Sequence, residues 1–192
     1  MALILASASA IRRTMLEQAG VEFEVVPACV DEDSEKTRHV DPSKLAETLA
    51  IKKALSVSKN QPAWVIGSDS VASVDGRRFD KPADRQQAAE HLRSFSGKAL
   101  RLTSAAALAR DGDIAWSLID TATLSVRPLS DEFIDAYLDA EWPEVGYCAG
   151  AFRLEGRGIQ LFDSIEGSYF TILGMPLLPL LGALRERRVI AS

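Results

Sequence analysis

The segment Ser7-Ala8-Ser9-Ala10-Ile11-Arg12-Arg13 places two hydroxyl groups and two guanidinium groups within one short stretch. Unpaired amides and the positive dipole end make a helix N-terminus attractive to an anion, whereas cations there oppose the dipole unless an anion compensates. The segment therefore predicts a polyphosphate site that uses Ser7, Ser9, Arg12 and Arg13. The alternative is that Ser9 only caps a helix and both arginines are solvated.

Carboxylates occur in two further places. Asp31, Glu32 and Asp33 lie together in a predicted acidic loop, and Asp69 follows the apolar segment Trp64-Val65-Ile66-Gly67. Carboxylate and phosphate oxygens are the ligands that Mg²⁺ and Mn²⁺ prefer, so the two elements could share such a cation. Asp69 could also act as the general base on water. The alternative is that the acidic loop is only solvated.

Two lysines are candidates for phosphate contacts, because an ammonium group stabilises the charge that develops on a transferring phosphoryl group and on its leaving group. Asp41-Pro42 predicts a helix start with an N-cap and a proline at the first position. Lys53 follows Leu45 by eight residues and Leu49 by four, which places it at the edge of their core-facing stripe rather than in open solvent. Lys81 precedes a proline in a predicted loop. The alternative is that Lys53 only extends its ammonium group from the helix face into solvent, and that Lys81 is an ordinary loop lysine.

Familiar phosphate and nucleophile motifs are missing. Gly97-Lys98 has no glycine at the P-loop spacing, and Gly156-Arg157-Gly158 lacks the third glycine of a dinucleotide fingerprint. His39 and His91 are isolated on polar segments, which predicts surface residues rather than metal ligands or catalytic bases. A Walker ATPase and a Rossmann dehydrogenase are therefore not supported.

Composition narrows the class of protein further. A net charge of −5 argues against a broad nucleic-acid surface, and 47% hydrophobic residues in 192 are ample for a core. Cys29 and Cys148 lack the CxxC spacing of a redox or zinc motif, which indicates a reducing compartment. The run at residues 1–6 has no basic region and predicts a buried strand. Residues 173–184 are too short to cross a bilayer and are expected to pack as a terminal strand and helix. A cytoplasmic protein without membrane or nucleic-acid partners is expected.

Strand and helix patterns must bring these residues together. Strands and helices alternate through the first hundred residues, and β-rich segments dominate the middle around the turn at Asp111-Gly112. The pattern predicts a mixed α/β sheet with flanking helices and a hairpin lobe. No repeat or linker divides the chain, so residues 1–192 are expected to form one domain. The predicted strands or β-rich segments are residues 3–6, 22–26, 64–67, 100–109 and 114–126, and residues 151–155 and 159–162 flank Gly156-Arg157-Gly158.

Nine fragments in order make the chain resemble the Maf family over nearly its whole length. Each fragment alone is weak, but their order and spacing are specific. The fragments are Leu5-Ala6-Ser7-Ala8-Ser9 with Arg12, Val30-Asp31-Glu32, Lys53-Ala54, Ile66-Gly67-Ser68-Asp69, Lys81-Pro82, Ser96-Gly97, Ala149-Gly150-Ala151-Phe152, Glu155-Gly156 with Gly158-Ile159, and Gly174 with Pro176-Leu177.

The resemblance implies a Maf/Ham1-like fold with two lobes around a cleft, frequent homodimers and dependence on a divalent metal. It also implies a hydrolase that converts a nucleoside triphosphate to its monophosphate and pyrophosphate, through attack of water at the α-phosphorus. In that reading Asp69, Lys53 and Lys81 are catalytic, and Glu32 and Asp69 bind the metal. The residues assigned to the substrate are Ser7, Ser9, Arg12, Arg13, Ser70 and Glu155.

Glu155 bears on the preferred base. The Maf group that acts on dTTP and UTP usually carries Gln here, whereas Glu155 resembles the 7-methyl-GTP group. A carboxylate can accept hydrogen bonds from the N1–H and 2-amino group of guanine, which favours guanine-type or other modified bases. Two positions depart from the pattern: Ile11 replaces an aromatic residue of the 7-methyl-GTP group, and Ser70 replaces the usual Thr or Gln.

Three alternatives stay open at this point. One is a dTTP/UTP pyrophosphatase. Another is a nucleotide-binding regulator of septum formation with vestigial hydrolysis, since Maf proteins are linked to inhibition of septum formation. The third is a plain phosphatase, which would release phosphate instead of pyrophosphate.

Overall fold

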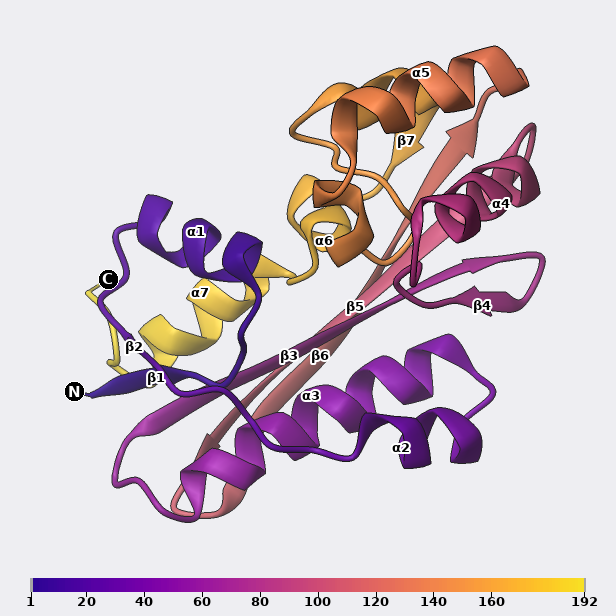
Figure 1. Ribbon diagram of the computed structural model, residues 1–192. Helices are drawn as coiled ribbons and strands as arrows, with labels where there is room; N and C mark the ends of the chain where they lie inside the picture. The colour runs from indigo at the N-terminus through magenta and orange to yellow at the C-terminus, as the bar shows by residue number, and fades with distance from the viewer. Residues whose placement is uncertain (1, 192) are drawn as a thin grey trace. The chain divides into compact units, whose positions relative to one another are not determined.

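The computed structural model describes residues 2–191, and the chain forms two compact units (Figure 1). The first unit comprises the chain up to Ser70, Thr103–Asp120 and the residues from Ser168 onward; the second comprises Val71–Leu102 and Thr121–Gly167. The described strands form a mixed sheet in the order β2-β1-β3-β5-β6-β7, with β4 paired to β3. The predicted mixed α/β sheet with flanking helices is confirmed.

In the first unit, helices cover both faces of the sheet. Strand β1 (Leu3–Leu5) pairs in parallel with β2 (Glu24–Val25) and with β3 (Trp64–Val74). Leu3 and Leu5 are buried in one cluster with residues of α1 (Ala10–Gln18) and α7 (Leu177–Glu186). Ile4 lies in a separate cluster with Val57 of α3 (Pro42–Ser58). Side chains alternate between the faces of a strand, so this pattern requires helices on both sides, as Figure 1 shows.

The predicted acidic loop is in fact the helix α2 (Glu32–Arg38), and the loop prediction is wrong. Asp31 is its N-cap and accepts a hydrogen bond from the Ser34 amide at 3.1 Å. Carboxylates in the first turn stabilise a helix through its dipole, so Glu32, Asp33 and Glu35 favour this helix. The acidic residues therefore have the regular spacing of a helix and not the variable geometry of a loop.

Strand β3 is also longer than predicted. It runs through Ser68-Asp69-Ser70 to Val74, so Asp69 lies within the strand and not at its end. Polar residues did not end the strand, because their side chains have partners in the folded chain, and β5 (Ala99–Arg110) lies next to β3 in the sheet. The predicted turn at Asp111-Gly112 is confirmed: both residues have positive φ, of 52° and 85°, and they connect β5 to β6 (Asp113–Val126).

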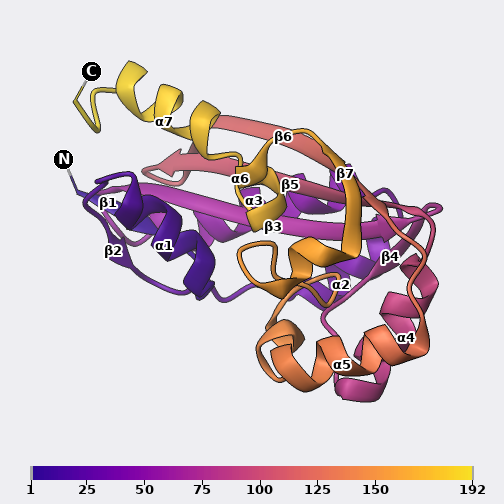
Figure 2. The same cartoon turned by 90° about the horizontal axis from the view of Figure 1, so that it is seen from above.

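The second unit contains β4 (Arg77–Phe79), α4 (Arg85–Phe95), α5 (Asp131–Glu141) and β7 (Phe162–Glu166). Helices α4 and α5 pack side by side (Figure 2). His91, expected at the surface, is half-buried against Phe79 and Phe95, and this burial lowers its pKa. Turns and a short 3₁₀ helix (Arg157–Leu161) precede β7.

The first unit also holds α6 (Tyr169–Leu173) and ends with α7, so the strand expected near residue 173 is absent from the described residues there. Among all described residues, no helix has the length and apolar character that crossing a membrane requires.

Gly67 sets the close approach of α3 to β3, and its replacement tests this packing. A Cβ atom at Gly67 would lie 2.1 Å from the Ala50 carbonyl oxygen and 2.5 Å from the Ala54 nitrogen. We expect Gly67→Ala to lower the free energy of unfolding by about 3 kcal/mol through overpacking. Gly182→Ala is the control, because no atom lies within 4 Å of its Cβ and alanine should stabilise α7 by up to about 1 kcal/mol. Equal urea midpoints for the two variants would contradict this account.

Candidate active site

Three charged side chains predicted from separate segments meet at one point of the first unit. The Lys53 ammonium nitrogen lies 2.6 Å from Asp69 Oδ1 and 2.7 Å from Glu32 Oε1. The Lys53 and Asp69 side chains are 11% and 13% exposed, whereas that of Glu32 is 41% exposed. A cation therefore lies between two carboxylates at the edge of a buried layer.

Three elements place these groups. Helix α3 begins at its Asp41 cap, whose side chain accepts from the Lys44 amide at 2.8 Å, and it packs on β3 at Gly67. Lys53 precedes Ala54, which packs against Gly67 together with Ala50, and its ammonium group reaches Asp69, two residues further along β3. Glu32 is the first residue of α2. The site thus depends on how α2, α3 and β3 pack.

Arg12 is buried next to this cluster. Its Nε donates to the Gly174 carbonyl at 2.9 Å and its Nη1 to the Ser68 carbonyl at 2.9 Å. Its Nη1 also donates to Ser7 Oγ at 3.3 Å, and its Nη2 to Ser70 Oγ at 3.0 Å. Burial lowers the pKa of the guanidinium, and the nearby charges of Asp69 and Glu32 oppose that shift. The guanidinium therefore ties α1 to β3 and to the turn at Gly174.

Buried hydroxyl groups complete this network. Ser70 Oγ donates to the Gly174 carbonyl at 2.9 Å and lies 2.8 Å from Ser104 Oγ, which donates to the Thr171 carbonyl at 2.7 Å. Ser68 Oγ donates to the Ala105 carbonyl at 2.8 Å. Gly174 has φ of 111°, a conformation that favours glycine, and its carbonyl accepts from both serines and from Arg12. Sequence reasoning missed Ser104 and Thr171.

The remaining residues of the N-terminal segment differ in their placement. Ser7 is buried and accepts from the Ser9 amide at 3.2 Å. Ser9 is the N-cap of α1, as predicted, but its side chain makes no capping hydrogen bond. Arg13 is 57% exposed and pairs with Glu17 at 3.5 Å. Ser7 therefore joins the Arg12 network, whereas Arg13 lies on the outer surface of α1.

Lys81 and Glu155 belong to the second unit, where both are exposed. Their charges act on the same group, the Cys148 thiol, together with that of Arg153. The Arg153 Nε lies 3.4 Å from Glu155 Oε1, and Arg153 Nη1 lies 4.0 Å from Glu141 Oε2. A ligand that donates a hydrogen bond to the Glu155 carboxylate would therefore contact a group that is already paired with Arg153.

Comparison with known proteins places this chain among relatives of similar length. The model of the Maf-like protein family matches residues 2–187. The chain belongs to the Maf family. It is 47% identical over 189 residues to the 7-methyl-GTP pyrophosphatase of Rhizobium meliloti (strain 1021), covering 96% of this chain and 95% of that protein. It is 46% identical over 195 residues to the nucleoside triphosphate pyrophosphatase of Granulibacter bethesdensis, covering 99% of each.

Among solved structures, the nucleoside-triphosphatase / dITP/XTP pyrophosphatase of Mycobacterium abscessus superposes with a TM-score of 0.41 at 20% identity. The match covers 66% of this chain and 73% of that one.

The donor set of this Maf chain suits a hard divalent cation that is shared with a substrate. The described residues contain no group of three or more His, Cys, Asp or Glu side chains arranged to hold a metal alone. Two carboxylates, those of Glu32 and Asp69, already converge on one positive charge, that of Lys53. Mg²⁺ is commonly held by one or two carboxylates together with substrate phosphates. Glu32 and Asp69 therefore fit this role.

Cys148 is expected to be an unreactive thiol in this Maf chain. Burial, followed by the charge of Glu155, raises the pKa of Cys148 to about 11. The thiolate is the reactive form, so at pH 8 we expect Cys148 to react with a thiol reagent at least ~10-fold more slowly than the exposed Cys29. The rates in Cys29→Ser and Cys148→Ser variants would be followed with a disulfide reagent. Rapid labelling of the Cys29→Ser variant would contradict the expectation.

Proposed function

We propose that this chain hydrolyses a nucleoside triphosphate to the nucleoside monophosphate and pyrophosphate with the help of a divalent cation. The observation that carries the proposal is the contact of Lys53 with both Asp69 and Glu32, beside the buried guanidinium of Arg12. The similarity to pyrophosphatases over nearly the full chain supports the same reaction. A site of mixed charge suits a metal-bound polyphosphate better than a free anion.

In the proposed reaction, the oxygen of a water molecule attacks the α-phosphorus and the bond to the oxygen that bridges to the β-phosphorus breaks. Asp69 accepts the proton of the water, and pyrophosphate leaves with the bond electrons. Lys53 holds the Asp69 carboxylate by a hydrogen bond of 2.6 Å. Glu32 and Asp69 would hold a divalent cation, which when bound offsets the phosphate charge.

The remaining polar groups would bind the triphosphate and its leaving group. We assign this role to the residues that can offer a positive charge or a hydroxyl group to phosphate oxygens, because such donors stabilise negative charge that develops during transfer. Those residues are Lys81, Ser7, Ser9, Arg12 and Ser70, whereas Arg13, on the outer surface of α1 and paired with Glu17, is given no phosphate contact.

The preferred base is proposed to be of the guanine type, with 7-methyl-GTP as the first candidate. Glu155 would accept hydrogen bonds from the N1–H and 2-amino group of guanine, whereas uracil or thymine would direct carbonyl oxygens toward the carboxylate. The R. meliloti relative is named a 7-methyl-GTP pyrophosphatase, which supports this choice.

A panel of nucleoside triphosphates tests the reaction and the base together. We expect 7-methyl-GTP or another modified guanine nucleotide to give the highest rate of pyrophosphate release with Mg²⁺ or Mn²⁺. Release of phosphate in place of pyrophosphate would overturn the reaction class. A higher kcat/KM for dTTP or UTP would overturn only the choice of base.

Glu155→Gln tests the base-reading role. We expect the ratio of kcat/KM for guanine-type nucleotides over dTTP and UTP to fall about 10-fold or more, because a donor or acceptor left unpaired when the bound base covers this side chain costs about 1–3 kcal/mol. Glu144→Gln is the control, since it removes the same charge from an exposed glutamate of the same unit. Unchanged selectivity in Glu155→Gln would remove this residue from base recognition.

A further inference from the structure

Glu35 is a buried carboxylate that the proposed reaction does not use. Its residue is 3% exposed, although it lies on α2, a helix rich in charged side chains. Its Oε1 lies 2.6 Å from Lys52 Nζ and 3.0 Å from Arg38 Nη1, and its Oε2 lies 3.4 Å from His39 Nε2. The hydrogen bond from Lys52 is the largest cause of a lowered pKa of Glu35. Such a group is ionised and compensated at neutral pH.

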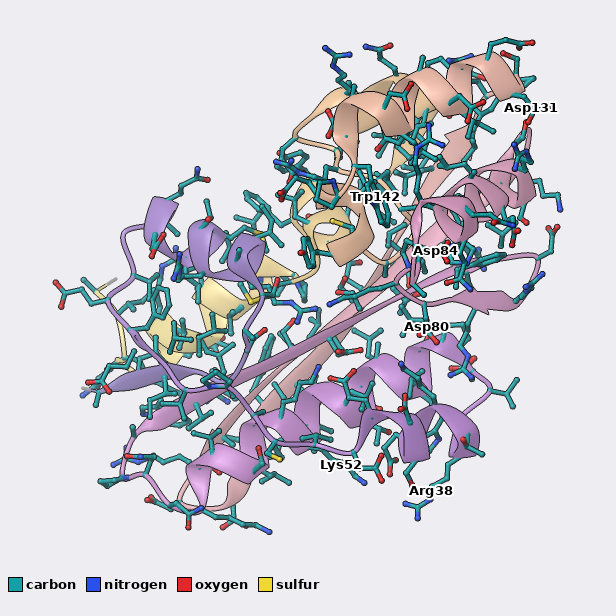
Figure 3. All side chains as sticks on the ribbon, viewed as in Figure 1. Arg38, Lys52, Asp80, Asp84, Asp131 and Trp142 are labelled. Atoms are coloured by element: carbon teal, nitrogen blue, oxygen red, sulfur yellow. The ribbon has the colours of Figure 1, made fainter. Side chains whose placement is uncertain are left out.

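The position of α2 depends on contacts with the rest of the fold. The helix has seven residues, and within it, all of which the structure describes, only Glu35 is buried. A helix of this length is not stable alone in water, so its packing must hold it in place. Helix α2 packs against α3, which carries Lys52 (Figure 3).

Two Glu–Lys pairs connect α2 to α3. Glu32 and Glu35 are one turn apart on α2 and contact the neighbouring residues Lys53 and Lys52 of α3. Residues three apart lie on the same face of a helix, so both glutamates face α3. On α2 the Glu35 side chain is the more buried of the two glutamates, 4% exposed against 41% for Glu32, whereas on α3 Lys52 is 44% exposed and Lys53 only 11%. A fixed Glu35 thus determines where Glu32 can lie.

We propose that Glu35 and Lys52 form a positioning pair, which docks α2 on α3 and thereby holds the Glu32 carboxylate where it binds the divalent cation. This inference rests on the proposed cation site of Glu32 and Asp69. Neither Glu35 nor Lys52 touches the substrate in this role. They act as the outer residues of a metal site do, whose loss typically weakens metal affinity or activity about 10- to 100-fold.

Mn²⁺ binding to the nucleotide-free protein tests the pair without relying on turnover. Free Mn²⁺ is measured by electron paramagnetic resonance in a titration of each variant. We expect Glu35→Gln and Lys52→Met to weaken Mn²⁺ affinity roughly 10-fold. In Lys52→Met, Glu35 keeps Arg38 at 3.0 Å as a partner. This variant therefore still tests the pair if Glu35→Gln folds poorly. Lys52→Arg keeps a cation and is expected to bind as the wild type does.

Lys44→Met is the matched control on the same helix. It breaks the pair of Lys44 and Glu47, which lie 3.2 Å apart with a 61% exposed lysine side chain. We expect this variant to keep the Mn²⁺ affinity of the wild type. In turnover assays, the Mn²⁺ concentration for half-maximal rate should rise only for Glu35→Gln and Lys52→Met, while the rate at saturating Mn²⁺ stays within about threefold.

Three results would overturn the positioning role. One is a wild-type protein that binds no Mn²⁺. Another is Mn²⁺ affinity in both test variants equal to that of the wild type, whatever their stability. The third is equal weakening in Lys44→Met. Failure of the proposed reaction is distinguishable, because a protein that binds Mn²⁺ through this pair but releases no pyrophosphate would contradict the reaction and not the pair.

Discussion

Asp69→Asn is expected to lower the turnover of pyrophosphate release about 10²- to 10⁴-fold, the range that a general base usually contributes. Asparagine has the shape of aspartate, but it cannot accept a proton at neutral pH and is a poorer ligand for a hard cation. In this variant the Lys53 ammonium loses the charge of Asp69, 2.6 Å away, but keeps Glu32 at 2.7 Å as its anionic partner. Steady-state release of pyrophosphate from the best nucleotide measures the effect.

Asp33→Asn is the control for the loss of a carboxylate. The Asp33 side chain is 93% exposed and pairs with Lys36 at 3.3 Å, outside the Lys53 cluster, so its turnover should match the wild type. Nucleotide binding should persist in Asp69→Asn, because the other phosphate donors remain. If Asp69→Asn retained full turnover, Asp69 would have no catalytic role. If the wild type bound nucleotide without hydrolysis, a regulator with vestigial chemistry would be favoured.

Local sequence signals were sufficient for part of the site. The Asp41-Pro42 start and the spacing of Leu45, Leu49 and Lys53 predicted both the helix and the face that carries the lysine. The structure confirms the cap by its hydrogen bond to the Lys44 amide and places Lys53 in the half-buried layer. These features depend on backbone periodicity and capping, which neighbouring residues determine.

Other parts depend on contacts between distant residues, which local patterns do not encode. Ser68 and Ser70 look like the polar end of a strand, yet both donate to the Gly174 carbonyl, more than a hundred residues away. The same carbonyl receives the Arg12 guanidinium. The charge of Asp31, Glu32 and Asp33 favours a loop, but the Asp31 cap and the acidic first turn favour a helix. In this segment the capping signal outweighs the polarity, and α2 forms.

Arg12→Lys is expected to lower the free energy of unfolding by about 3 kcal/mol, because a single ammonium cannot replace the planar set of guanidinium donors. In the folded chain, separate nitrogens of Arg12 reach Gly174, Ser68 and Ser70 at 2.9, 2.9 and 3.0 Å. Lysine keeps the positive charge near Asp69, so the loss reports the hydrogen-bond geometry rather than the charge. Urea denaturation followed by circular dichroism measures it.

Arg13→Lys is the matched control, since the 57% exposed Arg13 makes an i,i+4 pair with Glu17 and its replacement should change stability by less than about 0.5 kcal/mol. Equal stability of the two variants would mean that the Arg12 hydrogen bonds do not hold α1 to β3 and the Gly174 turn. If Arg12→Lys is less stable than Arg13→Lys, as expected, its KM should also rise. Two causes would contribute to this rise: displacement of the Gly174 turn with its serines, and loss of a phosphate contact. Arg12 would then position the polar residues next to the Lys53 cluster in addition to any contact with phosphate, because the protein itself occupies most of its donors.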